Sequence, residues 1–337
     1  MPGWAIALII VGGVILLILL AVVLPMVLIT MPIAEKLYKL QWTRGEHAFE
    51  RGCSDASFDY HLDMFNKGME WRENNLKFKK DVEVISDNTK LVGEYFDFGF
   101  KKAIILMPGR TETCYYACFY APTFKEAGYN VLTIDPRAHG LSEGKILTLG
   151  KLEGLDLIEW SKLLHNKFGI ETVVLYGLCG GGTASCVAFN NPNCPDYIKG
   201  FISDGMFYSF FNVYRRHIID EKHPVYPVIW EVLGKIKHRN GVNPYKTTPK
   251  NLIQNVKVPT LFLTGEKDKF AVPEEAYKLY ELSGSNNKQI HLIKNARHSH
   301  LRYDNLEDYD KAVIPFLKSI DWKERYEKDS NEETSFI

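Results

Sequence analysis

The feature that most constrains the fold is a regular alternation of short apolar and amphipathic segments from residue 81 onward. Residues 81–86 and 90–97 alternate in the manner of an antiparallel strand pair. Buried parallel strands form continuous apolar runs, and six follow, at 103–107, 130–134, 172–176, 198–203, 260–264 and 289–293. Helices are expected between most of them, at 115–127, 149–168, 180–190, 273–282 and 306–320. This order predicts an α/β domain with a mostly parallel sheet of about eight strands flanked by helices.

Two further stretches lie outside the alternation. Residues 205–250 separate two predicted strands by far more than an ordinary connection and are rich in aromatic side chains. We interpret them as a small helical cap over the site, with ordinary helices packed against the domain as the alternative. Residues 32–80 are expected to form a connector with a helical stretch around 55–67. The main domain is therefore predicted at residues 81–322, followed by a polar tail at 323–337 with no assigned function.

The chain begins with an unbroken apolar run at residues 4–30, and no charged side chain precedes Glu35. As a helix this run would extend roughly 40 Å, whereas about 20 residues suffice to cross a bilayer. A cleaved signal peptide is the alternative. However, no Lys or Arg precedes the run, the run is too long for a signal core, and no clear A-x-A site follows it. We therefore predict a transmembrane anchor at residues 1–31.

The basic residues nearest this anchor predict its orientation. Lys36, Lys39 and Arg44 follow the run, and the positive-inside rule then assigns the C-terminal domain to the cytoplasmic side of the cell membrane. The six cysteines form no C-x-x-C pair and are too sparse for a disulfide scaffold, so neither a zinc site nor a disulfide-rich fold is indicated. Lys+Arg and Asp+Glu are both 41, and this balance gives no reason to expect a nucleic-acid partner.

The strongest chemical motif is the sequence GLCGG at residues 177–181, between a predicted strand and a helix. A nucleophile on such a sharp strand-to-helix turn needs small neighbours two positions away, and Gly177 and Gly181 meet that need. The helix N-terminus would also stabilise a thiolate at Cys179. The alternatives are a tight glycine turn with a structural cysteine and a dinucleotide-binding loop, but the G-x-G-x-x-G order is absent.

Candidate partners for Cys179 follow two later strands. Asp268 comes after the run at 260–264, and His298 comes after the run at 289–293. Parallel strands present their functional residues at their carboxyl ends, so the chain order predicts a Cys179–His298–Asp268 triad. His300 is the alternative histidine, and Asp204 is the alternative acid.

An oxyanion hole requires two backbone N–H groups beside the nucleophile. Gly180 directly follows Cys179 and is expected to supply one of them. The loop after the strand at 103–107 is expected to supply the other, and Arg110 is the preferred donor because Gly109 permits the necessary turn. A plain Pro-Gly turn is the alternative for this loop.

These features together resemble the α/β-hydrolase superfamily over residues 81–320. The segment DPRAHGLS at 135–142 is similar to the family's D-x-R-x-H-G-x-S segment after the fourth strand, in which Arg137 and His139 are expected to be structural. The ensemble is similar to membrane-anchored bacterial hydrolases of the broad esterase and peptidase type. A cysteine nucleophile resembles dienelactone-hydrolase-like and some acyltransferase members, and Pro108-Gly109 stands where the family usually has His-Gly.

The resulting functional hypothesis is a membrane-anchored acyl hydrolase that acts on an ester, thioester or lactone. Cys179 would form an acyl-cysteine that water cleaves after activation by His298. The expected substrate is a small or lipid-like acyl compound, and no cofactor or metal is expected. An acyltransferase, a relative of serine peptidases and a non-catalytic binding protein of the same fold are the alternatives.

Overall fold

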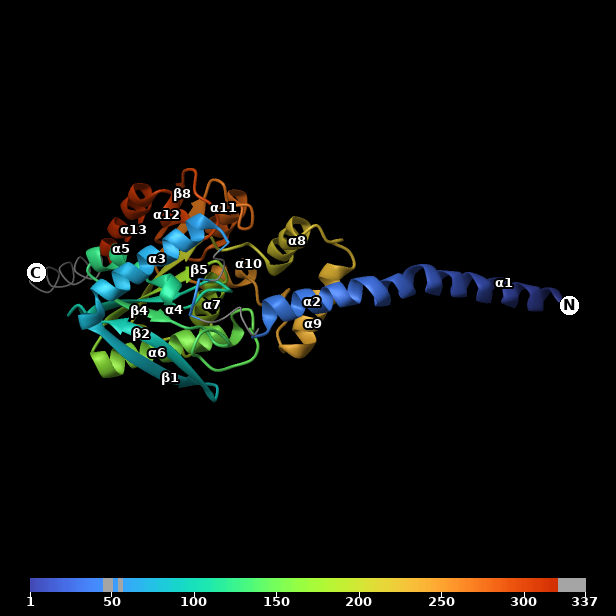
Figure 1. Ribbon diagram of the computed structural model, residues 1–337, viewed down its shortest axis with the longest axis horizontal. Coiled ribbons are helices and arrows are strands. Elements are labelled where there is room, and N and C mark those ends of the chain that lie inside the picture. Colours follow the sequence, from blue (N-terminus) through green and yellow to red (C-terminus); the bar gives the residue numbers. More distant parts are fainter. Residues whose placement is uncertain (45–50, 54–56, 321–337) are drawn as a thin grey trace, which may run out of the picture.

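One eight-stranded sheet forms the centre of the molecule, in the order β1-β2-β4-β3-β5-β6-β7-β8 (Figure 1). The computed structural model describes residues 1–44, 51–53 and 57–320, and the tail predicted at 323–337 lies outside these residues. The strands are β1 (Lys79–Ser86), β2 (Thr89–Phe96), β3 (Lys102–Met107), β4 (Asn130–Ile134), β5 (Thr172–Leu178), β6 (Ile198–Asp204), β7 (Thr260–Gly265) and β8 (Lys288–Ile293). β2 pairs antiparallel with β1 and β4, and the other neighbours are parallel. The predicted fold class is confirmed.

Helices cover both faces of the sheet. One face packs with α3 (Asp59–Asn74), α4 (Cys114–Ala117), α5 (Ala121–Glu126), α12 (Leu301–Asp304) and α13 (Leu306–Ile320). The other packs with α6 (Lys151–Phe168), α7 (Gly180–Phe189) and α11 (Pro273–Leu282). Short helices also occur at α10 (Pro249–Leu252), η3 (Leu76–Phe78) and η4 (Ile253–Asn255). Each face thus has its own apolar core, as a doubly covered sheet requires.

The single helix predicted at 115–127 is instead the pair α4 and α5. Between them the amides of Phe119 and Tyr120 bond three residues back rather than four. Pro122 lies in the first turn of α5 and has no backbone N–H to donate to the carbonyl oxygen of Cys118. The proline therefore divides the segment.

The connector predicted at 32–80 is mostly regular structure packed on the domain. Its first part, α2 (Met31–Trp42), continues the N-terminal helix and lies between α8 (Phe210–Asp220) and α9 (Val228–Arg239) (Figure 1). The helix predicted around 55–67 is α3, which extends to Asn74. A third apolar cluster joins α2 to the cap and includes Trp42 and Tyr214. The predicted cap region is thus helical, and α2 completes it.

The N-terminal helix leaves the rest of the molecule on the cap side (Figure 1). It comprises α1 (Gly3–Ile18), the π-helical turns η1 (Leu19–Val23) and η2 (Met26–Thr30), and α2. Gly3–Trp42 is long and apolar enough to cross a membrane, and its most apolar stretch is not buried against the protein. A signal sequence would meet the same criteria of length and composition.

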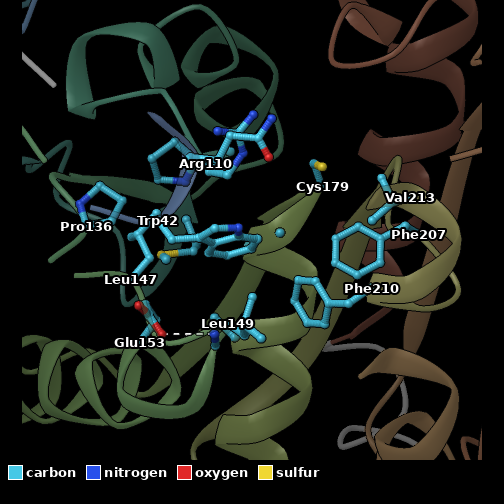
Figure 2. Close-up of a pocket in the computed structure, with 18 of the residues that line it drawn as sticks. Trp42, Arg110, Pro136, Leu147, Leu149, Glu153, Cys179, Phe207, Phe210 and Val213 are labelled. Carbon is cyan, nitrogen blue, oxygen red and sulfur yellow. Dashed lines mark hydrogen bonds between the residues drawn. The ribbon is translucent and has the colours of Figure 1, made fainter. Parts of the chain in front are cut away.

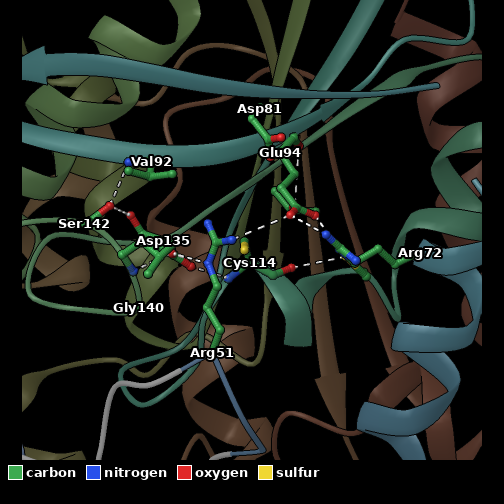
Figure 3. A network of polar contacts seen from close by, with 12 residues as sticks. Arg51, Arg72, Asp81, Val92, Glu94, Cys114, Asp135, Gly140 and Ser142 are labelled. Carbon is green, nitrogen blue, oxygen red and sulfur yellow. Dashed lines mark hydrogen bonds and ion pairs between the residues drawn. The ribbon is translucent and has the colours of Figure 1, made fainter. Parts of the chain in front are cut away.

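A buried ionic network ties segments before the sheet to its antiparallel edge (Figure 3). Arg72 on α3 forms a two-pronged pair with Glu94 on β2, at 2.6 and 2.7 Å. Arg51 donates to Asp135 at 2.8 Å, and the guanidinium groups of both arginines lie over the ring of Tyr115. Because both carboxylates are almost completely buried, each depends on these cations for compensation.

Replacing Glu94 by alanine is expected to lower the free energy of unfolding by about 3 kcal/mol, because it leaves the Arg72 guanidinium buried without its main partner. Urea unfolding followed by tryptophan fluorescence measures this change. Glu83→Ala on β1 is the matched control, since Glu83 pairs with Lys90 at the exposed surface and should cost less than about 1 kcal/mol. Equal losses in the two variants would contradict the structural role of the network.

Candidate active site

Cys179 occupies a strained turn between β5 and α7. Its backbone angles are φ 49° and ψ −109°, which side chains with a Cβ rarely adopt. A Cβ added to Gly177 would lie 2.5 Å from the nitrogen of Gly182, and one added to Gly181 would lie 2.4 Å from the carbonyl oxygen of Met107. Both glycines are therefore sterically required, as expected for a nucleophile turn.

Three loops bring the predicted triad residues together. Asp268 follows β7, His298 follows β8, and Cys179 follows β5. The Nδ1 of His298 lies 2.6 Å from Oδ2 of Asp268, and the same ring also hydrogen-bonds with Cys179. With Nδ1 engaged by the carboxylate, Nε2 is the nitrogen left to face the thiol. The histidine thus lies between an acid and a thiol, in the order that activates a nucleophile.

The charges around His298 favour its protonated form. Burial of the ring opposes protonation, but the negative charges of Asp268 and Cys179, together with hydrogen bonds to both, raise its pKa well above the ordinary value. Asp268 is fixed in this role because its Oδ1 accepts the amides of Phe270 and Ala271, each at 2.8 Å.

The alternative histidine, His300, points away from the thiol. Its Nδ1 lies 2.6 Å from the carbonyl oxygen of His298, and its Nε2 lies 3.1 Å from Nδ1 of His61 on α3. Burial lowers the pKa of His300 to about 4. The geometry therefore favours His298 over His300 as the partner of Cys179.

The alternative acid, Asp204, lies at the end of β6 but is not paired with the histidine ring. Its Oδ2 accepts the hydroxyl of Tyr176, and its backbone carbonyl accepts the amide of Cys179 at 2.8 Å. Within the described residues its Oδ1 has no partner, and burial raises the pKa of Asp204 to about 7. Asp204 supports the nucleophile turn, whereas Asp268 orients the ring of His298.

The loop after β3 is anchored from two sides. The Gly109 amide donates to Oε2 of Glu112 at 2.8 Å, and Nε2 of His139 contacts the carbonyl oxygen of Arg110. His139 also lies with Nδ1 2.9 Å from the carbonyl oxygen of Arg137, so it is a structural residue here. Arg110 and Gly180 both border the pocket at Cys179, and their role as oxyanion donors stays a prediction.

Comparisons with known proteins identify the family of this fold. A family model described as the alpha/beta hydrolase fold matches residues 102–218, and one described as serine aminopeptidase, S33, matches residues 235–304. The first match contains Cys179, and the second contains both Asp268 and His298. The chain belongs to the α/β-hydrolase superfamily.

Individual relatives of this hydrolase share about a quarter or less of its sequence. The uncharacterized protein YqkD of Bacillus subtilis (strain 168) is 26% identical over 220 residues, which is 64% of this chain and 71% of YqkD. The solved esterase Pf2001 of Pyrococcus furiosus is 25% identical, with a TM-score of 0.62 over 73% of this chain and 93% of the esterase. A thermophilic esterase from Thermogutta terrifontis is similar in fold, with 19% identity and a TM-score of 0.52 over 72% of this chain and 99% of that one.

The hydrolase has a largely apolar pocket that is open to solvent on one side. Cys179 lies at its border (Figure 2). Cap residues Phe207, Phe210 and Val213 form one wall of the pocket. The facing wall carries Trp42, Leu147 and Leu149. Such a lining accommodates an apolar group next to the thiol.

Several residues at this pocket could not be identified from the sequence. Gln41 and Trp42 come from α2, and Trp42 donates to the hydroxyl of Tyr214 at 2.9 Å. His217 on α8 stacks on Phe270 at 4.3 Å, and burial lowers its pKa to about 3, so it is neutral near pH 7. In the described part of the chain, no group of three His, Cys, Asp or Glu side chains could hold a metal.

The carboxyl of Glu112 should make stability depend on pH. Burial raises its pKa from 4.5 to about 7, so between these values the folded state binds more protons than the unfolded state. Stability from this group is complete below pH 4.5 and is lost as the pH rises through 7. Between pH 5 and pH 8, the Tm of Glu112→Gln should therefore fall less than the Tm of the wild type, by about 3 °C. Differential scanning fluorimetry measures this fall.

The slope of Tm against pH reports only the titration of the carboxyl, because any loss of stability from introducing an amide is the same at every pH. Glu281→Gln, which changes an exposed carboxyl on α11, should retain the wild-type pH dependence. If Glu112→Gln also retained it, the carboxyl of Glu112 would not titrate in this range.

Proposed function

We propose that this hydrolase cleaves esters through an acyl-cysteine intermediate at Cys179. His298 accepts the thiol proton, and the thiolate sulfur attacks the acyl carbon. The C–S bond forms, the bond to the alcohol oxygen breaks, and His298 returns the proton to the leaving alcohol. Water then loses a proton to His298 and attacks the thioester, which releases the acid and restores the thiol. Asp268 orients the ring and stabilises the imidazolium formed in each half-reaction.

The observation that carries this proposal is the position of His298 between the carboxylate of Asp268 and the thiol of Cys179. The amides of Arg110 and Gly180 are the proposed donors to the oxyanion, since both residues border the pocket beside the sulfur. The start of α7 lies directly after Cys179, and its positive end favours the negative charges that arise on sulfur and oxygen.

The substrate that fits best is an ester with an apolar acyl group. Its acyl part would lie between Trp42 and the phenyl rings of Phe207 and Phe210 in the pocket. The esterase Pf2001, 25% identical over most of its length, supports ester hydrolysis. A peptidase is the second candidate, because the serine aminopeptidase model matches residues 235–304. Release of nitroaniline from aminoacyl nitroanilides, without release of nitrophenol from esters, would favour the peptidase.

We also propose that the N-terminal helix is a retained membrane anchor, with the domain on the cytoplasmic side. Cleavage within this helix would have to spare α2, because Ala34, Leu37 and Trp42 are buried in the cluster shared with the cap. A continuous helix that ends in the wall of the pocket favours an anchor over a removable signal. The sidedness rests on Lys36, Lys39 and Arg44 after the apolar run.

Labelling with a fluorescent iodoacetamide tests whether Cys179 is activated. The background is Cys53→Ser, because Cys114, Cys118 and Cys186 are buried and burial raises the pKa of the Cys194 thiol to about 11. At pH 7 we expect Cys179 to be labelled, and His298→Ala to slow that labelling by roughly tenfold or more. Equal labelling rates with and without His298 would remove the case for an activated thiol and favour a non-catalytic binding protein.

A further inference from the structure

The protein leaves three apolar side chains uncovered at the end of α8, in the connection that follows and in the first turn of α9. Ile219, Tyr226 and Trp230 are exposed by 47%, 51% and 56%. The rings of Tyr226 and Trp230 lie 4.7 Å apart, so they form one aromatic surface. We call residues 224–230, which carry no charged side chain, the cap tip. Ile219 lies nearer the pocket end of α2, because the neighbouring Glu221 accepts from Gln41 at 3.4 Å. An exposed apolar cluster of this kind indicates a contact with another phase or molecule.

Hydrogen bonds from η2 and α2 to α9 and its C-cap residue give the position of the cap tip along the N-terminal helix. Thr30 donates to Glu231 at 2.8 Å, and Tyr38 donates to Asn240 at 2.6 Å. The two helices therefore run in the same direction, and α9 begins beside the last residue of the apolar run. Trp230 directly precedes Glu231, so the aromatic surface lies level with the end of that run.

On the N-terminal helix and α9, the charged residues other than Glu231 begin just beyond this level. Glu35 accepts from Lys235 and Arg239, each at 2.9 Å, and these hydrogen bonds lower the pKa of Glu35 to about 2. Along the axis from α1 to the domain, the order is thus an apolar run, an aromatic pair and then an ion-paired cluster. A helix and its neighbours show this order where they leave a bilayer, because Trp and Tyr favour the headgroup region.

We infer that the cap tip rests in the headgroup region of the bilayer that holds the N-terminal helix, with Tyr226 and Trp230 inserted at the interface. The cap tip lies on the side of the molecule from which α1 extends (Figure 1). The bilayer is the occupant that fits, because this surface is continuous with the apolar helix and linked to it through Thr30 and Glu231.

This arrangement narrows the substrate class, in a step that rests on the proposed function. Thr30 and Trp42 belong to one helix and are about 18 Å apart along its axis, and Trp42 lines the pocket. α8 also lines the pocket through Phe210, Val213 and His217, and the connection to the cap tip follows its last residue, Asp220. The pocket therefore lies about 18 Å from the level of the cap tip, on the side of the domain that faces the bilayer, and its substrates are long-chain esters that partition into the bilayer.

Fluorescence quenching by spin-labelled lipid tests the position of the cap tip without using activity. The full chain is reconstituted in phosphatidylcholine nanodiscs, and the Trp230 signal is the difference between the wild type and Trp230→Phe. We expect that signal to lose most of its intensity to lipid labelled near the headgroup and little to lipid labelled at the chain end. A Trp230 signal that neither lipid quenches, and that aqueous iodide quenches freely, would overturn the inference. Failure of the chain to incorporate into nanodiscs would overturn it as well.

Turnover of two esters tests the consequence for substrates. The double variant Tyr226→Ser/Trp230→Ser should hydrolyse a bilayer-embedded long-chain ester several-fold more slowly, and a soluble short-chain ester at the wild-type rate. Tyr277→Ser, at an aromatic residue on α11 that is 42% exposed, is the control outside the cap tip and should change neither rate. Equal rates of the double variant and the wild type on the embedded ester would contradict the substrate class. If the wild type hydrolysed neither ester, the proposed function would be wrong, and the quenching result would still stand.

Discussion

Cys179→Ala is expected to lower kcat/KM for a soluble nitrophenyl ester by at least about a thousandfold, because it removes the only group proposed to bond to the acyl carbon. The variant keeps the pocket and both proposed oxyanion donors, so a small residual rate above that of water is expected. Stability should change little, because Cys179 is only partly buried and its strained backbone is held by Gly177 and Gly181. Release of nitrophenol measures the rate, and thermal unfolding checks the fold.

Two further measurements separate loss of the nucleophile from indirect damage. In the wild type, rapid quenching followed by intact-mass analysis should detect the mass of the acyl group on the protein, and hydroxylamine should remove it as expected of a thioester. Cys179→Ser retains a possible nucleophile at the same place and should keep more ester turnover than Cys179→Ala. Full turnover in Cys179→Ala would show that the acyl-cysteine mechanism is wrong.

The strands and the order of the site residues could be predicted because both depend on local pattern. A buried parallel strand must be apolar along its whole length, so β3 to β7 were recognisable as runs, whereas β8 is a half-exposed edge strand with a weaker pattern. The nucleophile turn was recognisable because backbone contacts at Gly177 and Gly181 leave no room for a Cβ. Asp268 and His298 then followed from their position after strands, since the carboxyl ends of parallel strands meet at one edge.

The choice between competing residues required the structure. Asp204 and Asp268 both follow strands, and only the packing of the intervening loops decides which carboxylate reaches Nδ1 of His298. His298 and His300 are two residues apart, and the positive φ of 58° at Ser299 turns the chain between them. Such a reversal in a residue other than glycine leaves no clear local sequence signal.

Nothing in the sequence indicated that α2 forms a wall of the pocket. Trp42 and Tyr214 form a hydrogen bond across 172 residues of sequence, and neither residue stands in a recognisable motif. The apolar run at residues 4–30 predicts a helix, but it does not predict that the same helix continues into the cap. That continuity arises from burial of Ala34, Leu37 and Tyr38 against α9 and its neighbours.

Asp268→Asn is expected to lower kcat by roughly 10⁴-fold, because an amide in this position stabilises the wrong tautomer of the catalytic histidine. In the wild type, Oδ2 of Asp268 accepts from Nδ1 of His298 at 2.6 Å, which leaves Nε2 able to accept the thiol proton. The negative charge of Asp268 also helps to raise the pKa of His298, so the variant should contain less thiolate at neutral pH. Ester turnover and the iodoacetamide labelling rate of Cys179 should therefore fall together.

Asp204→Asn provides the comparison that makes this result specific. Both carboxylates are buried and lie at the same edge of the sheet, but Asp204 accepts from Tyr176 and not from the histidine ring. Its effect on kcat is expected to stay below about tenfold, since it changes the charge near His298 without changing the tautomer. A larger loss in Asp204→Asn than in Asp268→Asn would reverse the assignment of the acid. Comparable small losses in both variants would mean that His298 acts without a carboxylate partner.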